Sequence, residues 1–174
     1  MTSPLVLSDV RAAWCTIADR PAFLCDLQKI AASHDTHIIC FDADMIAGRV
    51  HATAAVTHAV RAFQEGENIS NTLEMEALLY AAGSRQCNIA VSFGIHEGRN
   101  KVYICCSPVR DDIWKDLEPL VQFTDESWDR IDQEMVGRLM KNFLITPDEI
   151  VAAGGEDRIV ELVLERTALL QVLR

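Results

Sequence analysis

The middle of the chain, residues 49–94, is divided by glycines into three consecutive predicted helices. Gly66, Gly83 and Gly94 each follow a segment whose apolar residues recur at helical spacing, and glycine readily adopts the left-handed conformation that ends a helix. The helices are predicted over residues 49–65, 73–82 and 85–93. Any fold of this chain therefore has to place three helices in succession between two strands.

The strands are predicted from short β-branched and apolar runs on both sides of these helices. They cover residues 10–17, 37–41 and 101–107, with an edge strand near residues 120–123. Further helices are predicted over residues 21–32, 113–117, 131–143 and 156–173, and Thr146 is expected to cap a helix that begins at Pro147.

A single α+β domain is the organisation that this order of elements favours. The 174 residues are enough for one hydrophobic core, and they contain no repeat or linker that divides them. We therefore expect one domain over residues 1–174, with a small mixed or antiparallel sheet covered by helices. The N-terminal residues do not resemble a signal sequence, and no apolar run reaches the length of a membrane span. We expect a cytoplasmic protein without a membrane partner.

The net charge of −10 argues against a general nucleic-acid-binding surface, because affinity for phosphates requires positive charge. The acidity is concentrated in residues 111–134, which hold nine acidic and two basic residues. Residues 49–101, in contrast, hold five of each. The excess negative charge therefore lies largely outside the helices in the middle of the chain.

The cysteines lie mostly inside apolar segments and lack the spacing of zinc ligands. They are Cys15, Cys25, Cys40, Cys87, Cys105 and Cys106. We predict reduced core residues, without a disulfide framework and without a bound cofactor.

One alternative function is a small metal- or thiol-dependent enzyme. Asp42 and Asp44 precede a predicted helix on which His51 and His58 lie seven residues apart, and therefore on one face. The thiol version would use a cysteine with a histidine as its base. The simpler interpretation is that the carboxylates cap the following turn or helix and that the histidines pack against other residues.

The break between two helices at residues 83–86 has two interpretations. A glycine followed by a serine, as at Gly83 and Ser84, is common between two helices, where the glycine ends the first helix and the serine caps the second. The same arrangement places Arg85 and Gln86 in the first turn of a helix. The unpaired N–H groups and the helix dipole at that position suit a phosphate or a base edge.

Glu76 is a charged residue among apolar neighbours in the predicted helix over residues 73–82. It can pair with Arg85 or with Arg61 and fix the plane of the guanidinium group. The alternative is a residue at the boundary of the core whose carboxylate lies in water.

Four separated stretches of the chain form a set of motifs. They are Asp42-Ala43-Asp44-Met45-Ile46-Ala47-Gly48, then His51, Ala55 and the run from His58 to Phe63, then the run from Glu76 to Gln86, and finally Leu164-Glu165-Arg166-Thr167-Ala168-Leu169. Together they resemble the CGI-type subunit of the KEOPS complex, a family with archaeal members whose eukaryotic relative is the PRPK-binding protein. The similarity extends over residues 36–104 and over the last third of the chain, in the family's order.

The resemblance implies a non-catalytic protein. KEOPS transfers a threonylcarbamoyl group to the adenosine next to the anticodon in tRNAs that read codons starting with A. The CGI-type subunit binds and supports the small kinase/ATPase subunit and, in archaea, holds the single-stranded 3' CCA tail of tRNA. A few unpaired nucleotides can be bound by local contacts and stacking, which is compatible with an acidic protein.

On this resemblance, Arg85 and Gln86 stand where the family has an Arg-Gln pair, and they are expected to contact the CCA tail. Arg85 would hold a phosphate or a base plane, and Gln86 would contact a base edge. Arg61 and His51, on the neighbouring helix, are further candidates for RNA binding. Cys87 departs from the larger aliphatic residue that is expected after the pair.

The C-terminal helix is the surface predicted to dock the kinase subunit, because it has more apolar residues than one core contact requires. The residues predicted to bind this partner are Ile159, Val163, Leu164 and Leu170. The alternative is that this helix closes the core.

Overall fold

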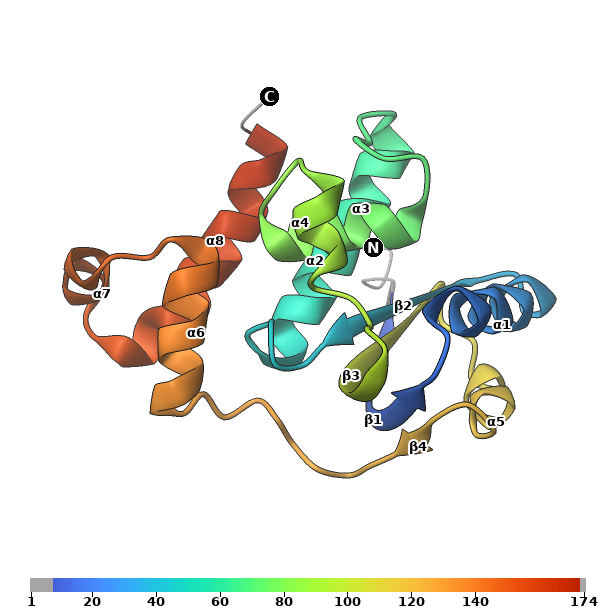
Figure 1. Ribbon diagram of the computed structural model, residues 1–174. Coiled ribbons are helices and arrows are strands. Elements are labelled where there is room, and N and C mark those ends of the chain that lie inside the picture. Colours follow the sequence, from blue (N-terminus) through green and yellow to red (C-terminus); the bar gives the residue numbers. More distant parts are fainter. Residues whose placement is uncertain (1–7, 173–174) are drawn as a thin grey trace.

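The computed structural model describes residues 8–172 and has a four-stranded sheet at its centre (Figure 1). The strands are β1 (Asp9–Ile17), β2 (His37–Asp42), β3 (Gly98–Ser107) and β4 (Gln122–Phe123). Their order in the sheet is β2-β3-β1-β4, and every neighbouring pair is antiparallel. The predicted α+β class is confirmed, and the sheet, predicted as mixed or antiparallel, is antiparallel.

Helices cover both faces of the sheet, because side chains alternate in direction along each strand and are apolar on both sides. One face carries α1 (Arg20–Ser33) and α5 (Ile113–Leu117). On the other face, α2 (Gly48–Glu65) and α3 (Leu73–Ala82) contact the strands, and α4 (Cys87–Val91), α6 (Gln133–Phe143), α7 (Pro147–Ala153) and α8 (Ile159–Val172) complete the larger core. The sheet therefore separates a smaller core under α1 and α5 from a larger core under the remaining α-helices.

The two cores share the strand β3. Tyr103 and Cys105 belong to the larger core, and Val102 and Ile104 belong to the smaller core. None of these four residues is more than 1% exposed. Because β3 packs on both of its faces and pairs on both of its edges, it fixes the position of both helical layers.

Four of the predicted helix ends agree with the structure, whereas the third predicted helix ends at Val91 with Ser92 as its C-cap residue, and not at Gly94 as predicted. Gly66 and Gly83 follow α2 and α3 in the left-handed conformation, with φ of 70° and 60°. Thr72 and Thr146 cap α3 and α7 by accepting a hydrogen bond from the backbone N–H three residues on. The helix predicted over residues 156–173 is different, because it starts as a short 3-10 helix, η1 (Glu156–Arg158), before α8. Residue 173 lies outside the described residues.

The cysteines are buried as predicted at four of the six positions. The four are Cys15, Cys40, Cys105 and Cys106, and all six thiols are free. Burial raises the pKa of the Cys15 thiol to about 11, so this thiol is protonated at neutral pH. The prediction of a core position was wrong for Cys25 and Cys87, which are exposed.

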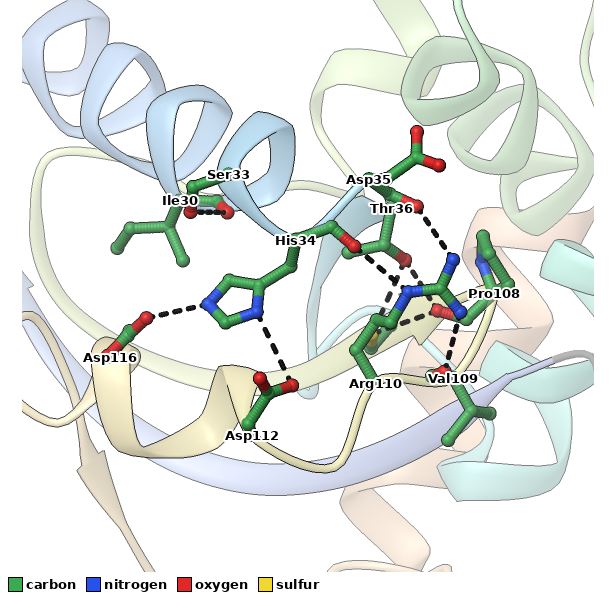
Figure 2. Close-up of polar contacts among 11 residues, drawn as sticks. Ile30, Ser33, His34, Asp35, Thr36, Pro108, Val109, Arg110, Asp112 and Asp116 are labelled. Carbon is green, nitrogen blue, oxygen red and sulfur yellow. Dashed lines mark hydrogen bonds and ion pairs between the residues drawn. The ribbon is translucent and has the colours of Figure 1, made fainter.

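A polar cluster joins the end of α1 to α5 and the segment before it (Figure 2). The ring of His34 lies between Asp112 and Asp116, with nitrogen–oxygen distances of 3.4 Å and 2.6 Å. Arg110 donates a hydrogen bond from Nε to the carbonyl oxygen of His34 at 2.9 Å and another from Nη2 to that of Asp35 at 3.1 Å. The hydrogen bond to Asp116 is the main reason why the pKa of His34 lies above the usual histidine value.

This cluster makes the stability of the protein depend on pH. Because the pKa of His34 is raised, its stabilising contribution is complete below the ordinary histidine pKa of about 6.5 and is lost as the pH rises through the raised value. The variant His34→Gln is therefore expected to lower the urea midpoint of unfolding more at about pH 5.5 than at about pH 8.5. An equal loss at both pH values would contradict this role of His34.

Candidate functional site

His51 connects three helical segments inside the larger core. Its Nδ1 accepts a hydrogen bond from the backbone N–H of Ala47 at 2.9 Å, which places the ring proton on Nε2. Nε2 lies 3.0 Å from the carbonyl oxygen of Ala81 in α3 and 3.2 Å from the hydroxyl of Thr167 in α8. The residue is fully buried, and burial lowers its pKa to about 4, so the ring is neutral at physiological pH. These contacts, which we call the His51 junction, fix α2, α3 and α8 relative to one another.

The loop that follows α3 is held against α8 next to this junction. A Cβ atom on Gly83 would lie 3.3 Å from the carbonyl oxygen of Arg166, so the two backbones approach closely. The guanidinium group of Arg166 in turn contacts the carboxylate of Glu149 at 2.7 Å and the carbonyl oxygen of Phe143 at 3.3 Å. The start of the α3–α4 loop therefore has a defined position on the larger core.

Arg85 and Gln86 lie on this loop and are both exposed. The sequence predicted that Ser84 caps the next helix and that both residues lie in its first turn. The structure corrects this prediction, because α4 begins at Cys87 and Gln86 is its N-cap residue. The hydroxyl of Ser84 accepts a hydrogen bond from the N–H of Gln86 at 3.1 Å, which closes a local turn and delays the helix.

Arg61 is also exposed, but the structure does not bring it close to Arg85. Ala81, near the end of α3, lies beside His51, and Arg61 follows His51 by ten residues along α2. Ten helical residues span roughly 15 Å. Of the four predicted RNA-binding residues, Arg85 and Gln86 are therefore adjacent, Arg61 lies on a separate part of the surface, and His51 is enclosed in the core.

The residues of the proposed metal site are not brought together. Asp42 accepts a hydrogen bond from the N–H of Asp44 at 2.9 Å and so stabilises the turn after β2, as the simpler interpretation predicted. His51 uses both ring nitrogens in the junction, and His58 stacks on Tyr80 with ring centroids 5.4 Å apart. Within residues 8–172, no group of three or more histidine, cysteine, aspartate or glutamate side chains could hold a metal ion.

The cap of α2 comes from a residue that the sequence analysis missed. Asp129 accepts hydrogen bonds from the N–H of Arg49 at 2.8 Å and from the hydroxyl of Tyr103 at 3.0 Å. A Cβ atom on Gly48 would lie 2.9 Å from the Asp129 carboxylate, which explains a glycine at this position. Asp129 is eighty residues away from Arg49 in the sequence, so no local pattern could indicate the pairing.

Glu76 has a structural role that neither sequence interpretation predicted. It is fully buried, and its carboxylate accepts hydrogen bonds from the N–H groups of Ile69 and Ser70 and from the hydroxyl of Ser70. The distances are 3.0 Å, 2.8 Å and 2.7 Å, respectively. Glu76 therefore holds the loop before α3.

The apolar face of α8 that was predicted to dock a partner packs largely inside the protein. Ile159, Val163 and Leu170 are no more than 5% exposed and belong to the larger core, while Leu164 is half-buried. The helix α8 packs against α2, α3 and α6, so the alternative, in which α8 closes the core, describes the three buried side chains. The most exposed large apolar side chains among the described residues are instead Leu144 and Val151.

The structure is that of a small α+β protein in which two of the candidate binding residues, Arg85 and Gln86, lie next to each other on the exposed α3–α4 loop. Residues 22–171 match the model of the CGI-121 family, described as kinase binding protein CGI-121. The chain belongs to this family, as the motifs predicted. No curated protein sequence matches the chain. Within residues 8–172, no helix is both long enough and apolar enough to cross a membrane.

The His51 junction predicts a large effect of a single substitution on stability. His51→Ala leaves a cavity and removes the partner of the Ala47 N–H, so we expect the free energy of unfolding to fall by about 3 kcal/mol. The exposed His96→Ala variant serves as the control and is expected to change it by less than about 0.5 kcal/mol. Urea unfolding followed by circular dichroism measures both. Similar small losses for the two variants would contradict the role of the junction.

Proposed function

We propose that this protein is a non-catalytic subunit of the KEOPS complex, which makes threonylcarbamoyladenosine in tRNA, and that it binds and supports the kinase/ATPase subunit. The main support for this proposal is that residues 22–171 match a family described as kinase binding. The four motifs that resemble the CGI-type subunit supply the link to KEOPS. A cytoplasmic location and the absence of a cofactor and of a membrane partner belong to the same proposal.

The 3' CCA tail of tRNA is proposed to bind at the α3–α4 loop. Arg85 and Gln86 are exposed there, next to the point where Gly83 packs against α8. A guanidinium group can hold a phosphate or stack on a base, and a carboxamide can bond to a base edge. The fixed start of the loop reduces the conformational entropy that these side chains lose on binding. Arg61 is proposed to make a separate contact with the tRNA, and His51 supports the loop from inside.

Binding of tRNA with and without its terminal CCA tests this site. We expect removal of the tail and the variant Arg85→Glu each to weaken binding at least tenfold, which corresponds to about 1.4 kcal/mol. The two losses are not expected to add, because both remove the same contact. Lys29→Glu, which makes the same change of charge on α1 across the sheet, is expected to bind like the native protein.

Two results would contradict the site. One is equal binding of intact and tailless tRNA, and the other is equal weakening by Arg85→Glu and Lys29→Glu. Where the isolated subunit binds below the detection limit, the same variants are compared in the assembled complex.

The kinase contact is proposed at the corner between α6 and α7. Leu144 and Val151 are 82% and 78% exposed, whereas their neighbours Ile145 and Ile150 are buried in the larger core. Leu144 also has a φ of 53°, which is unusual for a leucine, at the position that ends α6. Exposed apolar side chains mark a protein interface where they form a contiguous patch, and we propose that these two residues contribute to such a patch.

The double variant Leu144→Glu, Val151→Glu tests this contact. Because both side chains are largely exposed, the fold is expected to persist, while affinity for the kinase subunit falls at least tenfold, or about 1.4 kcal/mol. Val50→Glu, at a 52% exposed valine on α2, serves as the control. Calorimetric titration with the kinase subunit measures the affinity of the native protein, of the double variant and of the control. Unchanged affinity in a folded double variant would exclude this corner as the contact.

A further inference from the structure

The strand β2 is at the edge of the sheet, and its free side faces a groove. It pairs with β3 and with no other strand of the described chain, so half of its backbone groups point away from the sheet. The groove has a volume of about 280 Å³ and lies between α1 and the segment that contains α3 and α4. Its side walls are mostly apolar. An unpaired strand edge between apolar walls is a feature that the proposed function does not use.

The hydrogen bonds after β2 identify the backbone groups that face the groove. The N–H of Ala43 bonds to the carbonyl of Lys101 next to β3, whereas the N–H of Asp42 points the other way and bonds to the carbonyl of Phe93. Directions alternate along a strand, so the N–H and C=O groups of Ile38 and Cys40 also point away from β3. Among the described residues, no backbone hydrogen bond from outside the sheet reaches these groups.

The walls of the groove are held by polar contacts on both sides. The α1 wall contributes Leu24 and Leu27, and the polar cluster of Figure 2 anchors the end of this helix. The α3 wall contributes Met75 and Leu78. A 2.7 Å contact between Glu74 and His37 joins the first turn of α3 to the first residue of β2. The width of the groove is therefore determined by the fold.

We infer that this groove binds an extended segment of a partner protein, which adds a strand to the sheet beside β2. The N–H and C=O groups of Ile38 and Cys40 would pair with the backbone of a segment of about four residues. Alternate side chains of this segment would contact the α1 wall and the α3 wall. The apolar walls favour a segment with apolar residues at alternate positions.

The backbone groups favour a peptide over a purely apolar ligand. Phe93 already provides one such contact, since its carbonyl accepts a hydrogen bond from the outward N–H of Asp42. A bound segment would continue this row at Cys40 and Ile38. An apolar molecule would cover the same groups without bonding to them, at a cost in free energy. The groove shares no residue with the loop of Arg85 and Gln86, so this inference does not depend on tRNA binding.

Selection of peptides from a random display library against the full-length protein tests the inference. We expect the selected peptides to carry apolar residues at alternate positions and to lose binding when a pairing amide is N-methylated. Leu24→Glu, at a 42% exposed leucine on the α1 wall, is expected to weaken their binding at least tenfold. Val50→Glu, an exposed position outside the groove, is expected to bind them like the native protein.

The alternative occupants give different results. Failure to select any peptide, or equal binding to Leu24→Glu, would overturn the inference. Binding that is insensitive to N-methylation would indicate an apolar-ligand site instead. Dimers that Leu24→Glu abolishes, measured by sedimentation, would show that a second copy of the chain occupies the groove.

Amide hydrogen exchange provides an independent readout at the strand itself. In the free protein, the amides of Ile38 and Cys40 are expected to exchange faster than those of Ile39 and Phe41, which point toward β3. Saturation with a selected peptide is expected to slow exchange at Ile38 and Cys40. Fast exchange that persists at these two amides in the saturated protein would overturn the proposed strand addition.

Discussion

The hydrogen bonds of His51 are the contacts on which the helical layer over the larger core depends. One neutral ring joins the turn before α2 to the end of α3 and to α8, although Ala81 and Thr167 lie 30 and 116 residues away in the sequence. A neutral imidazole offers one donor and one acceptor, and in a core of low polarity each bond is worth more than it would be in water. The same arrangement holds Gly83 against α8 and thereby determines where the α3–α4 loop leaves the core. Several residues of the four family motifs, such as His51 and Thr167, therefore have a structural role. Their contacts determine where the exposed residues of the motifs, Arg85 and Gln86, are placed.

Several helix ends that are determined by neighbouring residues could be predicted from the sequence, although the local turn that Ser84 forms with Gln86 was wrongly predicted to be a helix cap. Gly66 and Gly83 end helices because of their own backbone conformation. Thr72 caps a helix because its hydroxyl accepts a hydrogen bond from the N–H of Met75, three residues further on. Features that depend on distant residues could not be predicted. The cap of α2 by Asp129 and the burial of the apolar face of α8 both require the tertiary arrangement, in which residues far apart in sequence meet.

For the same reason, the sequence could indicate only some of the positions that the candidate residues take in the fold. The adjacency of Arg85 and Gln86 is local, and the structure keeps both on an exposed loop. The separation of Arg61 from this loop and the enclosure of His51 depend on how α2 packs against α3 and α8. The surfaces with proposed partners accordingly lie on different elements: the α3–α4 loop, the corner between α6 and α7, and the free edge of β2. A small acidic protein with separate contact surfaces can hold several partners at once without a large basic face.

The order of the strands also has a consequence for the synthesis of this protein on the ribosome. Both β1 and β2 pair with β3, and Asp9 of β1 lies opposite Cys106 of β3. At translation rates of about 5–20 residues per second, roughly 5–20 s pass between the synthesis of β1 and the synthesis of its partner β3. During this interval the nascent chain can form helices α1 to α4 but no part of the sheet. The strands β1 and β2 are then without a pairing partner, and unpaired strands of this kind are prone to aggregation until β3 has been made.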